Sequence, residues 1–204
     1  MRFVWTVTGD DPDFAVGDRH GIDGYFWPMF DSLTTKANLQ DTQSRGHAVG
    51  LYMVTNWPQF IGKTPKQIAA IVNAEYTRLF IPGLKVQFDM EEHDLRPEVD
   101  DPNKIASTLE EWRLFRPWTG TSWTMEANQG GWMSPNFVKR ILTCRVRLVP
   151  QCYNGAMTEV WDTLTYARDL TERGFPDSSI SPFYDAAKLP VGWDGFAFTM
   201  GRLP

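Results

Sequence analysis

Strand-like apolar stretches alternate with helix-like stretches along the whole chain. The strand-like stretches are rich in β-branched and aromatic residues, and the helix-like ones carry apolar residues three or four positions apart. One helix is predicted over 31–46, with Asp31 or Ser32 as its start and Gly46 as its end. Another begins at Thr64, with Pro65 and Gln67 completing a capping box. The predicted strands cover 2–9, 21–30, 48–57, 85–92, 121–127, 145–154, 180–188 and 192–203.

This alternation predicts an α/β fold with a parallel sheet and right-handed crossovers. Eight such units in 204 residues indicate a compact, TIM-like (β/α)8 barrel that forms a single domain over 1–204. The helical pattern is weakest between the first two strands and between the last two. A doubly wound open sheet is the alternative, although the chain has no G-x-G-x-x-G or P-loop motif to support a nucleotide-binding version.

Composition narrows the range of partners. The net charge is -5 and no basic run is present, so the sequence argues against a nucleic-acid partner. The apolar runs are too short for membrane insertion, and the first residues lack the apolar core of a signal peptide. We therefore expect a soluble protein made in the cytoplasm. Nine tryptophans are present, and such flat apolar rings suit stacking on sugars.

The predicted strand at 85–92 has one apolar face and one polar face. Side chains of a strand alternate between its faces, so Val86 and Phe88 lie opposite Gln87, Asp89 and Glu91. In a barrel the apolar face meets the helices, and the polar row points inward. Carboxylates inside a barrel are costly unless they are solvated or hydrogen-bonded, and at the carboxyl end of a strand they are typical of an active site.

The same alternation, applied to later strands, places more polar side chains at this mouth of the barrel. Trp27, Trp57 and Trp132 lie at strand ends or just beyond them, where a stacking role on substrate is expected for at least one. The side chains expected to converge on the mouth are Asp89, Glu91, Glu126, Gln151, Tyr153 and Asp185.

Paired carboxylates with aromatic neighbours suit glycoside hydrolysis. Asp89 and Glu91 are two residues apart on one face, with Cα atoms about 6.5–7 Å apart. Like charges at this distance favour a proton on one of them, so Glu91 is the predicted acid and Asp89 its modulator. The structural alternative is that both carboxylates are buried partners of Arg145 or Arg147.

A metal site is not expected. Glu92, His93 and Asp94 follow the strand, but adjacent residues rarely converge on one ion, and the chain has three histidines and no H-E-x-x-H motif. A serine hydrolase is disfavoured because no G-x-S-x-G elbow is present. Cys144 and Cys152 do not form a disulfide framework. No cofactor is predicted.

Two short motifs carry a family resemblance. "FDMEEHD" resembles the strand-4 D-x-E motif of family-25 lysozymes, and "VPQCYN" is similar to the strand-6 Q-x-Y-N of hevamine-like family-18 chitinases. Gln87 stands where the second family has an aspartate. The resemblance implies a muramidase-like or chitinase-like glycosidase with Glu91 as the acid. Its substrate would be a polysaccharide, an N-acetylated cell-wall glycan whose N-acetyl group Gln151 and Tyr153 hold.

The chain is also similar in style to barrel modules of bacteriophage tail and lysis proteins. This resemblance implies a virion-associated protein with other subunits of a viral assembly as partners. The alternative to an enzyme is therefore a catalytically inactive, sugar-binding or structural barrel in a larger assembly such as a phage tail.

Overall fold

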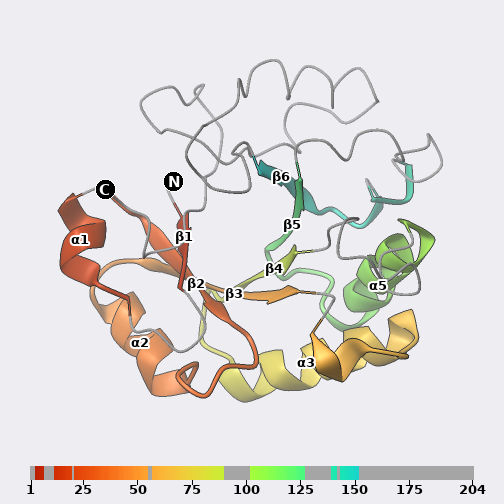
Figure 1. Cartoon of the computed structure of the whole chain (residues 1–204), viewed down its shortest axis with the longest axis horizontal. Coiled ribbons are helices and arrows are strands. Elements are labelled where there is room, and N and C mark those ends of the chain that lie inside the picture. The colour runs from red at the N-terminus through yellow and green to blue at the C-terminus, as the bar shows by residue number, and fades with distance from the viewer. Residues whose placement is uncertain are drawn as a thin grey trace.

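The computed structural model describes residues 3–6, 12–19, 21–54, 57–89, 102–126, 139–141 and 143–151. In this part of the chain, six strands form one parallel sheet with strand order β1-β2-β3-β4-β5-β6 (Figure 1). The strands are β1 (Phe3–Trp5), β2 (Gly24–Pro28), β3 (Ala48–Val54), β4 (Lys85–Asp89), β5 (Thr121–Glu126) and β6 (Arg147–Gln151). The helices are α1 (Phe14–Arg19), α2 (Lys36–Ser44), η1 (Pro58–Phe60), α3 (Pro65–Leu79) and α5 (Pro102–Phe115).

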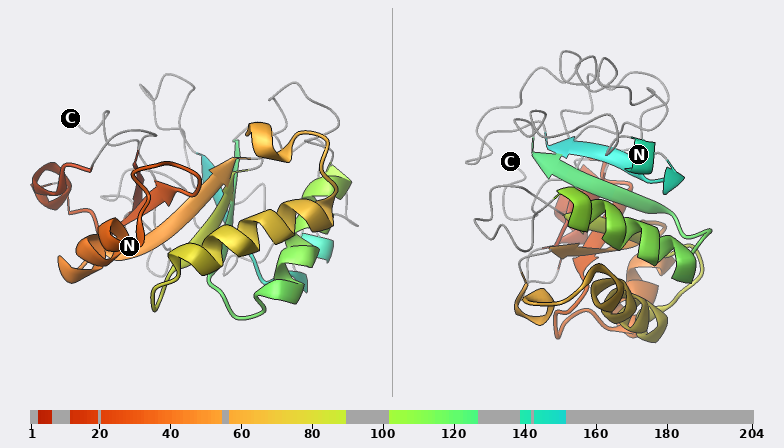
Figure 2. Two further views of the ribbon diagram at one scale, coloured as in Figure 1. Left: turned by 90° about the horizontal axis from the view of Figure 1, so that it is seen from below. Right: turned by 90° about the vertical axis from the view of Figure 1, so that its right-hand side faces the viewer.

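Every strand pairs with the next strand of the chain, and the order never reverses. A doubly wound sheet starts in the middle and reverses its direction of growth, so this order excludes the doubly wound alternative for the six strands. Right-handed crossovers that always step the same way place all helices on one side of the sheet. Figures 1 and 2 show this arrangement, with α1, α2, α3 and α5 along the outer side of a curved sheet.

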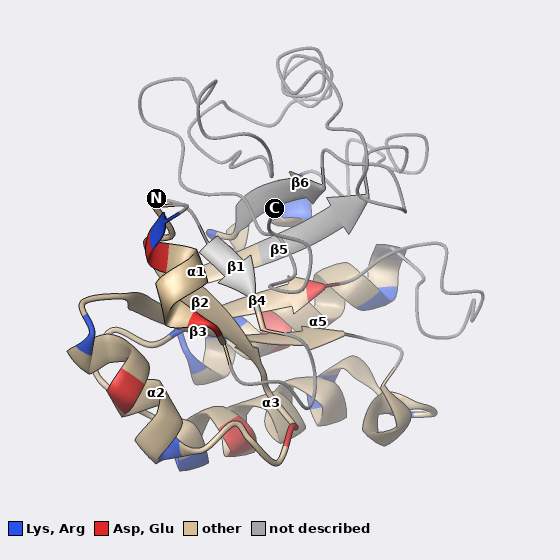
Figure 3. Ribbon diagram, turned by 60° about the vertical axis from the view of Figure 1, so that its left-hand side comes forward, with Lys and Arg blue, Asp and Glu red and all other residues tan. Residues whose placement is uncertain are grey.

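The core lies between the outer face of the sheet and the helices. Alternate residues of β2, β3 and β4 belong to it, such as Leu51 of β3 and Phe88 of β4, both fully buried. The helices contribute buried residues at helical spacing, and α3 packs against α5 through Tyr76 and Trp112, whose ring centroids are 5.7 Å apart. Charged residues of both signs are spread along the helices (Figure 3).

The expected capping box of α3 is confirmed. Thr64 Oγ1 accepts a hydrogen bond from the Gln67 amide at 3.3 Å, and Gln67 Oε1 accepts one from the Thr64 amide at 2.9 Å. The predicted start of α2 is wrong by several residues. Thr35 is its N-cap, because Asp31 instead accepts a bond from the amide of Leu33 and closes a turn before the helix.

The last two predicted strands, 180–188 and 192–203, lie outside the described residues. An α/β fold with a parallel sheet is therefore established, whereas eight strands and closure are not. None of the helices in the described ranges combines the length and the apolar character needed to cross a membrane.

Candidate active site

Strand β4 presents a buried amide and a buried carboxylate on the concave face of the sheet. Gln87 is 2% exposed and Asp89 is 6% exposed, and neither belongs to the hydrophobic core on the helix side. Val86 and Phe88 do belong to that core, so the predicted division of this strand into two faces is confirmed. Asp89 is the last residue of β4. Its carboxylate therefore lies at the carboxyl end of the sheet, where active sites of parallel α/β folds are found.

The strand register identifies the neighbours of these two residues. Tyr52 of β3 is the partner of Gln87, and Val54 is the partner of Asp89. On the other side Ser122 and Thr124 of β5 are their partners. Paired positions of parallel strands share a face, so Tyr52 and Ser122 lie on the same face as Gln87. The Tyr52 ring lies on this face at 8% exposure.

Tyr52 joins three strands across the concave face. Its hydroxyl donates to the carbonyl oxygen of Thr6 at 3.1 Å, beyond the end of β1. The Thr6 amide in turn donates to the carbonyl of Phe26 in β2 at 2.9 Å. The Phe26 ring covers Gly50 of β3, where no side chain competes for the space. These contacts hold Tyr52 and Phe26 in place on the concave face, and Tyr52 lies beside Gln87 in the register.

A small pocket of about 180 Å³, which we call the rim pocket, opens at the carboxyl ends of β2 and β3. Phe30 and Trp57 form its aromatic wall, with ring centroids 5.6 Å apart in an edge-to-face arrangement. Asp31 and Gln59 supply its polar lining. The Trp57 ring is 6.0 Å from the Tyr52 ring of the concave face, and Phe30 and Trp57 also pack against the core on the helix side. An apolar wall with a few polar groups is the usual composition of a small-molecule site.

The structure brings some of the predicted site residues together. Glu126 and Gln151 are register partners at the carboxyl ends of β5 and β6, the same end of the sheet as Asp89. Their side chains are outside the description. Trp57 lines the rim pocket, but Trp27 lies on the helix side of β2 at 2% exposure and does not reach the concave face.

Several predicted residues lie outside the described residues. They are Glu91, Tyr153, Asp185 and Trp132, together with Glu92, His93 and Asp94. The predicted acid Glu91 therefore stays a prediction. Of the two alternative partners of Asp89, Arg145 stands at the opposite, amino end of β6, with its guanidinium 5.4 Å from the Trp118 ring centroid. The side chain of Arg147 lies outside the description, so its pairing with Asp89 stays a prediction. Within the described ranges no group of three or more potential metal ligands is found.

Sequence reasoning missed Tyr52, Phe30 and Asp31. Tyr52 could have been found, because it alternates in phase with Gly50 and Val54, and its strand precedes β4 in the chain. Phe30 and Asp31 gave no comparable signal, because the pocket that they line depends on η1 folding back over the end of β2.

Comparisons with known proteins match the fold and not a family. No protein-family model matches the chain, and no curated protein matches it. A Burkholderia cenocepacia protein described as "a putative lyase/mutase" is similar in structure, with a TM-score of 0.57 at 10% identity over 98% of this chain and 76% of that one.

Two further structures are more distant. The 3-keto-D-glucoside 4-epimerase YcjR of E. coli has a TM-score of 0.49 at 13% identity, over 97% of this chain and 90% of that one. The aldolase QR15 has a TM-score of 0.46 at 11% identity, over 82% of this chain and 69% of that one. At such identities the similarity concerns the fold alone.

The resemblance to family-25 lysozymes and family-18 chitinases is wrong, and so is the glycosidase function drawn from it. The chain matches no model of either family, and the similar structure with a TM-score above 0.5 is described as a lyase/mutase. The motifs "FDMEEHD" and "VPQCYN" are short, and alternation on a barrel strand produces such patterns without common descent. The phage-tail assignment and its inactive-barrel alternative gain no support either.

Proposed function

We propose that the concave face around Asp89 is the active site of an enzyme that moves a proton at a carbon atom next to a carbonyl group. The substrate class is a small polyhydroxylated carbonyl compound. The reaction class comprises those epimerisations, lyase or mutase reactions and aldol reactions that pass through an enolate-like intermediate. The observation that carries this proposal is the buried carboxylate of Asp89 at the carboxyl end of β4.

Asp89 takes the role of general base. Asp89 is 6% exposed, so its carboxylate has lost most of its contact with water, which costs free energy. Buried ionisable groups of this kind are concentrated at functional sites. As general base, Asp89 removes the proton from the carbon and becomes a carboxylic acid, which returns the proton from the same face of the substrate to that carbon or to its neighbour. Inversion at the same carbon requires a proton from a second acid on the opposite face of the substrate. Gln87, two residues earlier on the same face, carries an amide N–H that suits a carbonyl or hydroxyl oxygen of the substrate.

The rim pocket supports the substrate class. Trp57 and Phe30 offer an apolar wall to the C–H face of a sugar-like molecule, while Asp31 and Gln59 suit its hydroxyl groups. A volume of about 180 Å³ fits a few carbon and oxygen atoms and not a polymer. The lyase/mutase description of the Burkholderia protein agrees with the reaction class.

The proposal includes a closed (β/α)8 barrel. Sequential strand order and helices on one side are the features that a closed barrel requires. The predicted strands at 180–188 and 192–203 would complete eight. In that arrangement Glu126, Gln151 and Asp185 stay predicted residues of the mouth, facing Asp89 across it.

The test is incorporation of solvent deuterium. The native protein is incubated in heavy water with a panel of ketoses, aldoses and 2-keto acids, and exchange at carbon is followed by proton NMR and mass spectrometry. We expect exchange with at least one sugar-like carbonyl compound. A panel in which no compound exchanges faster than in buffer contradicts the proposal.

Trp57→Ala tests the pocket separately from the base. Because stacking binds ground state and transition state alike, this variant should raise KM and leave kcat nearly unchanged. Ile61→Ala, at an exposed apolar residue near η1 but outside the pocket lining, is the matched control and should change neither constant.

A further inference from the structure

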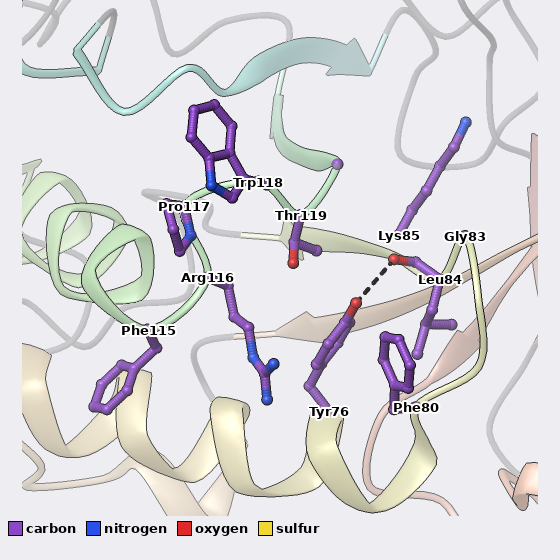
Figure 4. A pocket seen from close by; sticks show the side chains of 11 residues that line it. Tyr76, Phe80, Gly83, Leu84, Lys85, Phe115, Arg116, Pro117, Trp118 and Thr119 are labelled. Atoms are coloured by element: carbon purple, nitrogen blue, oxygen red, sulfur yellow. Dashed lines mark hydrogen bonds between the residues drawn. The ribbon is translucent and has the colours of Figure 1, made fainter.

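A larger pocket, of about 440 Å³, lies at the opposite end of the sheet from Asp89. It is formed where α3 and α5 end and where β4 and β5 begin; Lys85 is the first residue of β4, and Gly120 directly precedes β5. Figure 4 shows Tyr76, Phe80 and Leu84 on one side, and the segment from Phe115 to Thr119 on the other. The amino end of a parallel barrel is remote from its catalytic mouth. This pocket therefore needs another role.

Large apolar side chains are exposed around this pocket. Trp118 is 83% exposed, Phe80 45% and Phe115 39%, and the neighbouring Leu114 is 78% exposed. They account for four of the five large hydrophobic side chains exposed on the described surface, the fifth being Ile61. Contiguous exposed apolar residues mark interaction sites, and aromatic residues with arginine are the types enriched in the centres of protein interfaces.

Arginines surround the same pocket without carboxylate partners among the described residues. Arg116 donates to Asn73 Oδ1 at 2.7 Å and to the hydroxyl of Thr77, and its guanidinium lies 4.9 Å from the Tyr76 ring centroid. The Arg145 guanidinium lies over the Trp118 ring.

Arg113, beside the pocket, donates to main-chain carbonyls only. Its acceptors are the carbonyl oxygens of Cys144, Arg116, Thr119 and Arg145. Three other arginines of the described chain do pair with carboxylates: Arg45 with Asp41, Arg78 with Glu75 and Arg140 with Glu110.

We propose that this pocket is a docking site for an acidic protein segment that inserts one bulky apolar side chain. The apolar side chain would fill the space between Phe80 and Phe115, and flanking carboxylates would meet Arg116 and Arg145. Carboxylates form bidentate hydrogen bonds with guanidinium groups. Although the chain has a net charge of -5, none of its described carboxylates pairs with these two arginines, so the carboxylates of a partner segment would do so.

Two other occupants fit less well. A nucleic acid needs an array of cations along its backbone, whereas here the cations are few and the lining is mainly aromatic. A second copy of the chain would bring its net charge of -5, but four of the five large apolar side chains exposed on its described surface belong to this same patch beside the arginines. Both occupants are outcomes of the test.

The probe is a yeast-displayed library of random peptides, sorted on the native protein. Enriched peptides are synthesised, and their binding is measured by fluorescence anisotropy on the native protein and on variants. Trp118→Ser and Arg145→Glu alter exposed residues of the pocket rim, and circular dichroism verifies that both variants fold. Lys36→Glu, the same reversal of charge at an exposed residue of α2, is the matched control.

We expect enriched peptides that combine Asp or Glu with Leu, Phe or Trp. Each pocket variant should weaken their binding about tenfold or more, as at interface hot spots, and Lys36→Glu should leave it unchanged. The proposal is overturned if no peptide is enriched, if the peptides are basic, or if both pocket variants bind like the native protein. Trp118-dependent binding of single-stranded oligonucleotide, or Trp118-dependent self-association in sedimentation, also overturns it.

Discussion

Gly50 provides a direct test of how the concave face is packed. It lies in β3 opposite Phe26 of β2, and the Phe26 ring occupies the place of the missing side chain. In Gly50→Ala the new Cβ would stand 2.2 and 2.3 Å from two ring carbons. Since Phe26 is 4% exposed, the ring cannot move into solvent.

The magnitude follows from the overlap. An ordinary carbon–carbon contact is about 3.5 Å, so the ring or the strand must shift by roughly 1.3 Å. Overpacking of this kind in a closely packed interior costs about 1–3 kcal/mol. We expect Gly50→Ala to lower the free energy of unfolding by about 3 kcal/mol, the upper end, because β2 and β3 are hydrogen-bonded to each other on both sides of the clash.

The assay is urea denaturation followed by circular dichroism, in a double-mutant cycle with Phe26→Leu. The smaller side chain should relieve the clash, with a coupling energy of at least about 1 kcal/mol. Gly120→Ala is the matched control, because its Cβ would meet Lys85 at an ordinary 3.5 Å. If Gly50→Ala costs no more than Gly120→Ala, or if Phe26→Leu leaves its cost unchanged, the packing described here is refuted.

Three further predictions concern single groups. Thr64→Ala should cost about 1 kcal/mol in urea denaturation through loss of the capping box, whereas Thr64→Ser should retain most of it. Burial, with Asp18 and Asp13 adding to it, raises the pKa of Tyr25 to about 12. Stability is therefore full below pH 10 and falls by up to about 3 kcal/mol as the pH rises through 12, a loss that Tyr25→Phe should abolish in pH-dependent denaturation. Burial also raises the pKa of the Cys144 thiol to about 11, so in a Cys152→Ser background iodoacetamide should label folded protein far more slowly than unfolded protein, as read by mass spectrometry.

Local patterns predicted the elements that pack by their own periodicity. The alternation of Val86 and Phe88 with Gln87 and Asp89 gave the two faces of β4 correctly, because burial on one face requires it. The capping box at Thr64 was also readable, since its partners lie three residues apart.

Other features depend on contacts between distant segments and left no local signal. Helix α1 is six residues long and contains Gly17, a residue that disfavours helix, yet a Cβ at Gly17 would lie 1.8 Å from the Tyr25 hydroxyl. The helix therefore requires glycine for its close approach to β2. Trp27 was one of three candidates at strand ends for stacking on substrate, but it shares a face with Tyr25 and lies in the core.

The functional error had a different origin. Carboxylates at the mouth of a barrel indicate where a site lies and that it is negatively charged. Several unrelated reactions use carboxylates in this position, so neither property identifies the reaction. Asp89 was placed on the correct face, but neither its position nor its charge distinguishes a glycosidase from an epimerase or a lyase. The choice of glycoside hydrolysis then rested on short motifs such as D-x-E, which contain too few residues to identify a family.

The central claim is that Asp89 transfers the proton, and one ratio of rates tests it. Solvent-deuterium incorporation is measured for the best compound of the panel with the native protein, with Asp89→Asn, and with Asp41→Asn, a surface carboxylate paired with Arg45 on α2. Loss of the general base should reduce the exchange rate of Asp89→Asn by about 100-fold or more, and the rate of Asp41→Asn should equal that of the native protein. An Asp89→Asn protein that is folded and exchanges at the native rate would contradict the account.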